Sequence, residues 1–264
     1  MLTSVKAILW LHIIRLWRYK WSFLNMILTY VVWILLLMLG ILLFVPKESL
    51  GITVKAAYWT ILAWNVISQF SSLIGGWMGF FISTGMVEEH ILRGISPFKV
   101  ITGRVIPGFS VILMSQAFIA VLLGEMFKVD VLGIINPALT VLSFVLLMME
   151  SLSYGLIISS ISLRTSIPHA MLEILNFAIV GLLMMPVTSL PPMLGIIYLA
   201  IPYVAPTYLM KIATIGGIGG APLYFEAMII SVVETLIFLV IGIYSMKRSE
   251  EWMKRNGVRA VGFW

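Results

Sequence analysis

The sequence predicts an all-α membrane protein with six transmembrane helices, an N-terminal amphipathic helix at the membrane interface, a short cytoplasmic helix and outer re-entrant helices. Hydrophobic residues make up 61% of the 264-residue chain and charged residues 11%, and the mean hydropathy is +1.09. A soluble domain has about 25% charged residues, so this composition excludes a water-soluble globule. Uncharged runs such as 22–45 and 56–83 exceed the ~20 residues that a helix needs to cross a bilayer.

The first 21 residues differ from the spans because charged and apolar positions recur in them at helical spacing. His12, Arg15 and Arg18 share one helical face, whereas apolar residues such as Leu9 and Trp17 occupy the other. This pattern is typical of a helix that lies flat in the interface, here on the inner leaflet. The alternative is a basic flank of the first span, where Arg and Trp are common anchors.

Lys and Arg residues are distributed unevenly between the two sides of the predicted membrane domain. The predicted spans cover residues 22–45, 56–83, 102–124, 137–162, 167–190 and 225–246. With the N-terminus inside, thirteen Lys and Arg residues lie on the inner side, and only Lys47, Lys55, Lys128 and Lys211 lie outside. Because positive residues favour the cytoplasmic side, we expect a multi-pass plasma-membrane protein with both termini, including a tail at 247–264, in the cytoplasm.

Residues 174–210 carry no charge over 37 positions, which is too long for one span. Two spans here would place the C-terminal cations outside and remove the charge asymmetry. Five prolines between Pro186 and Pro206 also break any continuous helix. We therefore expect one span followed by a re-entrant segment, 191–224, that dips into the membrane from the outer face.

The loop at 84–99, between the second and third spans, has the pattern of a short charged helix. Met86, Val87, His90 and Ile91 fall on one helical side, and Gly94 and Pro97 end the helix. Water-facing side chains on the other side are Glu88, Glu89 and Arg93. A solvated loop without a partner is the alternative interpretation.

These residues resemble the permease subunits of ABC exporters of the ABC-2 type. The helix between spans two and three of that family often reads G-x-x-E-x-x-L-L-R-P-x-x-P, and Gly94 stands here where the family often has proline. A second resemblance is to the family's outer L-P-P-W and N-P-x-T-Y segments, with Ala205 in place of asparagine. The first pattern is matched at its spacing by Gly85, Glu88, Ile91, Leu92, Arg93 and Pro97, and the second by Leu190-Pro191-Pro192 and Pro206-Thr207-Tyr208.

The resemblance implies an exporter subunit that dimerises with a second copy and couples to two separate cytoplasmic ABC ATPase subunits. ATP and Mg²⁺ would bind those subunits, because this chain has no G-x-x-x-x-G-K-[ST] sequence. The cargo implied is a lipid, a drug-like amphiphile or a polysaccharide. The residues that would couple to the ATPase are Gly85, Glu88, Glu89, Ile91, Leu92, Arg93 and Pro97.

Three acidic residues lie inside predicted spans: Glu150, Glu173 and Glu234. A charged side chain at the bilayer centre costs about 2.5–3.5 kcal/mol on insertion scales, so each should face protein or a wet cavity. Binding of a cation, a proton or a polar substrate group is one role, and a hydrogen bond between helices by a protonated acid is the other. His169 and Glu173 are too few ligands for a metal site.

Small residues form a stripe along the second span that includes Ser72 and Gly76. Close helix packing explains such a stripe, and the alternative places it on the dimer axis along a transport path with Glu150 and Glu234.

Two other functions are compatible with parts of this pattern. An ATP-independent secondary transporter or channel would use Glu150 and Glu234 as ion sites, but it favours an internal hydropathy repeat, which is not visible. An intramembrane enzyme would need a catalytic motif such as H-E-x-x-H or G-x-S-x-G, and neither occurs. The absence of cysteine excludes thiol catalysis and thiolate metal sites, and the net charge of +6 is better explained by the membrane surface than by nucleic acid.

Overall fold

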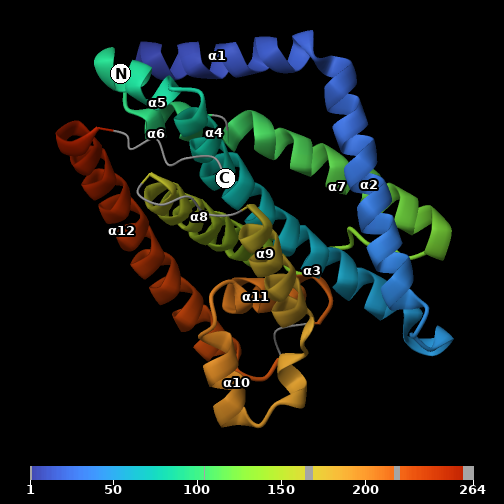
Figure 1. Ribbon diagram of the computed structural model, residues 1–264. Helices are drawn as coiled ribbons and strands as arrows, with labels where there is room; N and C mark the ends of the chain where they lie inside the picture. Colours follow the sequence, from blue (N-terminus) through green and yellow to red (C-terminus); the bar gives the residue numbers. More distant parts are fainter. Residues whose placement is uncertain (1, 104, 164–168, 217–220, 258–264) are drawn as a thin grey trace.

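A computed structural model of the chain describes residues 2–103, 105–163, 169–216 and 221–257. Within these ranges every regular element is a helix, and none is a strand (Figure 1). The helices are α1 Leu2–Arg18, α2 Lys20–Leu42, η1 Lys47–Ser49, α3 Leu50–Phe70, η2 Ser71–Gly76, α4 Trp77–Ser83, α5 Met86–Leu92, α6 Pro97–Thr102, α7 Val105–Phe127, α8 Pro137–Ser162, α9 His169–Met184, η3 Val187–Ser189, α10 Pro192–Leu199, α11 Val204–Thr214 and α12 Tyr224–Asn256.

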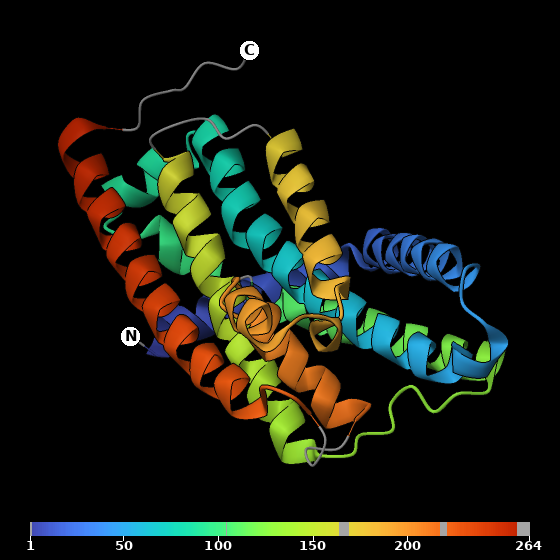
Figure 2. The same ribbon diagram turned by 90° about the horizontal axis from the view of Figure 1, so that it is seen from below.

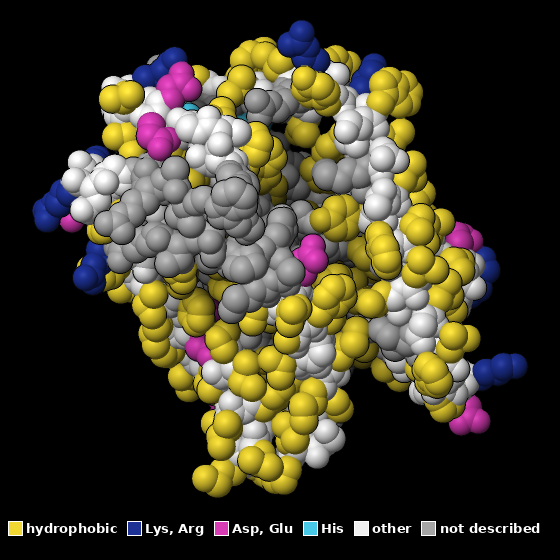
Figure 3. Space-filling model, viewed as in Figure 1, with side chains coloured by type: hydrophobic (Ala, Val, Ile, Leu, Met, Phe, Trp, Pro, Cys, Tyr) yellow, Lys and Arg dark blue, Asp and Glu magenta, His cyan; other side chains and the backbone are white. Residues whose placement is uncertain are grey.

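The predicted helical, transmembrane character of the chain is confirmed. Five helical segments in the described part are long and apolar enough to cross a membrane, or six if α10 and α11 together make one broken span. In the space-filling view, charged side chains gather around the end that carries α1 and α5 and at the far ends of α2 and α7 (Figure 3). Apolar side chains cover most of the surface between them, as expected for a surface that faces lipid.

The second predicted span, 56–83, begins earlier in the structure and is interrupted. Its helix starts at Leu50, so Lys55 lies inside α3 rather than in an outer loop. The helix accommodates this lysine because the ammonium group donates to the carbonyl oxygen of Gly133, while the neighbouring Val54 is fully buried. Over Ser71–Gly76 the backbone forms a π-helix, which sequence periodicity does not reveal.

The fifth and sixth predicted spans also differ in length from their helices. α9 has only 16 residues, and the chain then turns at Pro186 into η3 and α10. α10 and α11 meet at an angle of 110°. α12 has 33 residues and continues to Asn256, so much of the expected tail at 247–264 is helical; residues 258–264 lie outside the described part.

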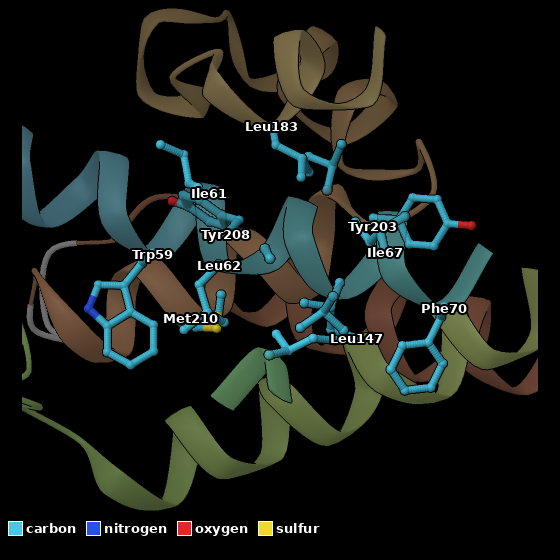
Figure 4. Packing of buried hydrophobic residues seen from close by; sticks show 14 of the residues in the cluster. Trp59, Ile61, Leu62, Ile67, Phe70, Leu147, Leu183, Tyr203, Tyr208 and Met210 are labelled. Carbon is cyan, nitrogen blue, oxygen red and sulfur yellow. The ribbon is translucent and has the colours of Figure 1, made fainter. Parts of the chain in front are cut away.

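The helices are arranged around α3 and α8, which lie side by side in the middle of the molecule (Figures 1 and 2). α12 runs beside α8, and α2 lies on the opposite side of the molecule together with α7. Figure 4 shows the core, whose members include Ile67 and Phe70 of α3, Leu147 of α8 and Met210 of α11. The core therefore lies where three segments distant in sequence meet.

Small residues allow α3 and α8 to approach closely at the π-helix. The backbone of Gly155 is so near η2 that a Cβ atom there would lie 2.8 Å from the carbonyl oxygen of Phe70. Ser159 donates its hydroxyl hydrogen to the carbonyl oxygen of Ile74 at 2.8 Å. The contact thus satisfies a backbone oxygen in the π-helix, where the regular hydrogen-bond pattern is disturbed.

Candidate functional site

The predicted cytoplasmic helix is α5, and backbone geometry fixes both of its ends. Gly85 precedes the helix with φ +70°, and Gly94 follows it with φ +69°, a conformation that is unfavourable for residues with a Cβ atom. At the C-terminal end, Gly94 N–H donates to Ile91 O at 2.9 Å and Ile95 N–H to His90 O at 2.8 Å. These two bonds form a Schellman motif, which ends the helix at a defined residue. Pro97 then occupies the first turn of α6.

The apolar side of α5 faces its own chain. Val87 is completely buried, Met86 and Ile91 pack against the core, and the His90 ring stacks on Phe81 with 5.4 Å between centroids. The helical side predicted from the spacing of these apolar residues therefore packs inside the chain and is not available to a partner. The physical reason is that α4 and α6 lie close to α5 and bury its most hydrophobic surface.

The exposed side of α5 carries Glu89, Leu92 and Arg93. Arg93 Nη2 and Glu89 Oε1 form an ion pair at 2.5 Å, and Leu92 is 88% exposed. Ile95, just beyond the helix, is 43% exposed. We call Glu89, Leu92, Arg93 and Ile95 the α5 outer face. It is a fixed ion pair beside two apolar side chains, a combination suited to binding a protein partner.

The remaining coupling residues predicted from the sequence lie in different environments. Glu88 is not fully on the aqueous surface as expected: it is half-buried, and its Oε2 atom is buried without a hydrogen-bond partner. Pro97 is buried, Ile91 is half-buried and Gly85 is exposed at the turn. Among the predicted set, only Glu89, Leu92 and Arg93 therefore present side chains outward.

A contact with the C-terminal part of α12 supports the loop after α5. Ser96 donates its hydroxyl hydrogen to Glu250 Oε2 at 3.1 Å, and Lys254 lies 3.4 Å from the other oxygen of Glu250. Ser249 and Met253 on the same helix are buried. This contact was not predicted from the sequence, because 247–264 was expected to be a tail. The i,i+4 pair of Glu250 and Lys254 is the signal that indicates a helix there.

α1 lies across the end of the molecule that also carries α5 and α6 (Figure 1). Its surface is largely apolar, with Trp10 64% and Trp17 77% exposed, as expected for a helix that contacts lipid. Arg18 is exposed as predicted, but His12 is buried, so these two residues do not share a water-facing surface. The Arg15 side chain lies outside the described part.

The structure brings Glu150 and Glu234 to one place inside the helix bundle. Glu150 is fully buried on α8, where it accepts a hydrogen bond from Tyr203 N–H at 3.2 Å and one from the Thr235 hydroxyl at 3.1 Å. Thr235 is the immediate neighbour of Glu234 on α12, so Glu234 lies one residue away from the side chain that contacts Glu150. Glu234 Oε2 is buried and has no hydrogen-bond partner among the described residues. Both acids were predicted to be unusual from the sequence, but their common location in the bundle was not.

Tyr203 completes this carboxyl cluster, which we define as Glu150, Glu234, Thr235 and Tyr203. Its backbone has φ +72° at the start of α11, which is uncommon for a residue other than glycine. Its ring lies 5.9 Å from Tyr154 and 6.3 Å from Phe238 between centroids. The hydroxyl group is buried, and no residue in the described part of the chain forms a hydrogen bond with it. The positive φ of Tyr203 thus lets its backbone N–H donate to Glu150, while its phenol group has no partner among the described residues.

The other site residues predicted from the sequence do not lie together in a single site within this chain. Ser72 is exposed and Gly76 half-buried, whereas their neighbour Gly75 packs against Ile158. Glu173 is exposed, and the His169 side chain lies outside the described part. Among the described residues, no three His, Cys, Asp or Glu residues are grouped as they would be to hold a metal ion.

Comparison with known proteins gives no relative: no protein-family model, no curated protein and no solved structure matches this chain.

Proposed function

We propose that this chain is the membrane-spanning permease subunit of an ATP-driven exporter of the ABC-2 type, working as a dimer with two cytoplasmic ATPase subunits. The observation that carries the proposal is the α5 outer face. α5 is held by left-handed glycines at both ends and by its buried side, yet it exposes Leu92 and the Glu89–Arg93 ion pair. A short helix fixed in this way moves with the body of the membrane domain, so a partner that displaces it also displaces the bundle.

Two neighbouring elements support the same role. The bond between Ser96 and Glu250 joins the loop after α5 to the end of α12, which runs along α8 through the bundle. α1 lies at the same end of the molecule with exposed tryptophans. A movement at α5 therefore has a direct route through α12 to the helices that hold the carboxyl cluster.

The transport path would form between two copies of the subunit. Ser72 and Gly76 lie on a part of η2 that α8 does not cover, so a second copy can approach the backbone closely there. Under this proposal the cargo is a lipid, a drug-like amphiphile or a polysaccharide, and ATP and Mg²⁺ are bound by the partner ATPase. The subunit itself catalyses no reaction.

The proposal is tested by charge reversal on the α5 outer face. Glu89→Lys should weaken association with the ATPase subunit, because it removes the ion pair and places two like charges on a surface adapted to one acid. Glu125→Lys is the matched control, since Glu125 forms an exposed ion pair with Lys128 at 2.9 Å far from α5. ATPase copurification and ATPase-driven transport are measured for both. Equal behaviour of the two variants would contradict the proposal.

The carboxyl cluster favours a second candidate, an ATP-independent transporter that uses Glu150 and Glu234 as an ion or proton site. Its specific support is that Glu150 bonds to Thr235, the neighbour of Glu234 on another helix, and to the backbone of Tyr203, whose phenol has no partner among the described residues. The purified chain in proteoliposomes, without nucleotide or ATPase, separates the candidates. Ion-driven solute uptake that is lost in Glu234→Gln would support this second function, and absence of uptake would reject it.

A further inference from the structure

A cavity of about 240 Å³ lies between the start of α3, the end of α9, α10 and α11. Most of its lining is apolar and flexible, with Leu183, Met184, Val187 and Val204 among the contributing residues. Figure 4 shows Leu183 of α9 and Tyr208 of α11, both lining residues, in the core cluster beside α3. This cavity is separate from both the α5 outer face and the carboxyl cluster.

The two tyrosines of the lining already have hydrogen-bond partners. Tyr208 donates its phenolic hydrogen to Pro222 O at 2.6 Å. Tyr198 donates to the carbonyl oxygen of Leu182, with Met185 O at 3.3 Å. These bonds fix the loop around the cavity, and they leave neither phenol with a spare hydrogen to donate to a ligand.

Lys211 brings a positive charge to the cavity wall. Its ammonium group donates one hydrogen bond to Leu183 O at 2.6 Å, and an ammonium group has three hydrogens to donate. None of the ion pairs in the described part of the chain includes Lys211. A partly buried cation without a counter-ion is unfavourable, so an anion in the cavity would be bound tightly by it.

Thr207 adds a second unused donor one helical turn away from Lys211. It is 1% exposed, it lines the cavity, and its Oγ1 atom is without a hydrogen-bond partner in the described structure. A buried hydroxyl without a partner costs roughly 1–3 kcal/mol, which a ligand acceptor would recover. Because residues i and i+4 share a helical face, both donors can reach one headgroup.

We propose that this cavity binds the acidic headgroup of a monoanionic amphiphile, with Lys211 and Thr207 on the acid and the apolar lining around the first part of its chain. The volume favours a headgroup with a short length of chain, because pockets for whole drug-sized ligands usually measure about 300–1,000 Å³. A carboxylate of a fatty acid and a phosphate of an anionic lipid share the chemistry required. The site is defined by the cavity itself and does not depend on coupling to an ATPase.

Binding to the full-length chain in nanodiscs of phosphatidylcholine tests the site. Palmitate is the first probe, and methyl palmitate is its neutral control. Phosphatidylglycerol is the second probe, and its binding is compared with that of added phosphatidylcholine by native mass spectrometry. We expect saturable binding of one acid per chain and none of the methyl ester. Palmitate binding alone would identify a fatty-acid type of ligand, and phosphatidylglycerol binding alone a lipid headgroup; either outcome supports the site.

Two variants link binding to the proposed donors. Lys211→Gln should weaken binding of the acid by about tenfold or more, as expected for loss of a charge-assisted hydrogen bond, and Thr207→Val by a smaller factor. The matched control is Lys55→Gln, because Lys55 is also half-buried and bonded to a backbone carbonyl but does not line the cavity. Folding of each variant is monitored by thermal unfolding.

Three results would overturn the inference. They are equal binding of the methyl ester and the acid, unchanged acid binding in a folded Lys211→Gln variant, and absence of binding of both probes to the unmodified chain. If Lys211→Gln does not fold, Thr207→Val and the comparison of acid with ester in the unmodified chain decide the question. Transport coupled to ATP can fail or succeed without changing any of these results.

Discussion

At the scale of single residues, the buried Glu150 carboxyl group holds three elements together. It lies on α8, and it accepts hydrogen bonds from the backbone of Tyr203 at the start of α11 and from Thr235 on α12. The acid is therefore costly to remove, because the Tyr203 N–H would lose its acceptor in a dry environment, whereas the Thr235 hydroxyl also donates to Ser231 O at 2.8 Å. This structural role is compatible with either function considered for the cluster.

Substitutions at Glu150 separate the contribution of its acceptor oxygens to stability from the contribution of its charge. Glu150→Gln keeps one acceptor oxygen and should change the free energy of unfolding by about 1 kcal/mol or less, whereas Glu150→Leu should destabilise by about 1–3 kcal/mol because it leaves the Tyr203 N–H without an acceptor. Thermal unfolding of both variants in the same detergent measures the difference. Equal stability of Glu150→Leu and the unmodified chain would contradict the hydrogen-bonding role.

Glu234→Gln is expected to affect stability less than substitutions at Glu150 do. Glu234 Oε2 lacks a partner, so Glu234→Gln should leave stability within about 0.5 kcal/mol. A change in transport without a change in stability would then assign a functional role to the charge. If Glu234→Gln instead destabilises the chain as much as Glu150→Leu does, the Glu234 carboxyl group forms a stabilising hydrogen bond, and the interpretation of Oε2 as unpaired is wrong.

At the scale of elements, the contact between α8 and η2 depends on the absence of a side chain at Gly155. Gly155→Ala would bring a Cβ atom to 2.8 Å from Phe70 O and 2.9 Å from Ile74 Cβ, so we expect destabilisation of about 1–3 kcal/mol. Gly181→Ala in α9 is the control, because nothing lies within 4 Å of its Cβ position. The midpoint temperature of thermal unfolding should be lower for Gly155→Ala than for the unmodified chain, and unchanged for Gly181→Ala.

The contact between the α5–α6 loop and α12 is tested by Ser96→Ala. Loss of the 3.1 Å bond to Glu250 should cost about 0.5–1.5 kcal/mol locally and increase hydrogen exchange over residues 94–99. Ser83→Ala is the control, because the Ser83 hydroxyl bonds to Phe80 O within its own helix. Equal exchange rates in the two variants would show that α12 does not support this loop.

Elements were predictable from the sequence where hydropathy determines them and less predictable where packing does. Long uncharged runs indicated the spans, and the glycine, proline and charge pattern at 84–99 indicated α5. The π-helix was not predictable, because it depends on Ser159 and Gly155, which are about 80 residues away. The outward side of α5 was predictable only in part: Glu89 and Arg93 are exposed as expected, whereas Glu88 is half-buried because neighbouring helices pack against α5.

At the scale of the whole molecule, distant residues converge in ways that spacing alone does not encode. Glu150 and Glu234 were both recognised as unusual, yet only the parallel packing of α8 and α12 places them together. Likewise, Lys211 was counted as an outer positive residue, whereas its place on a cavity wall follows from the 110° bend between α10 and α11. Function in this chain therefore rests on helix contacts as much as on motifs.

The central claim, that the α5 outer face binds an ATPase subunit, is tested most directly by site-specific cross-linking. The chain has no cysteine, so a single Leu92→Cys substitution gives one thiol at the 88% exposed position. Met193→Cys, at a 76% exposed position on α10, gives a matched thiol at the opposite end (Figure 1). The chain is expressed together with a candidate P-loop ATPase subunit and treated with a bifunctional thiol–amine reagent. We expect a cross-link to the ATPase from position 92 and none from position 193. Active transport without a cross-link at position 92, or equal cross-linking at both positions, would contradict the claim.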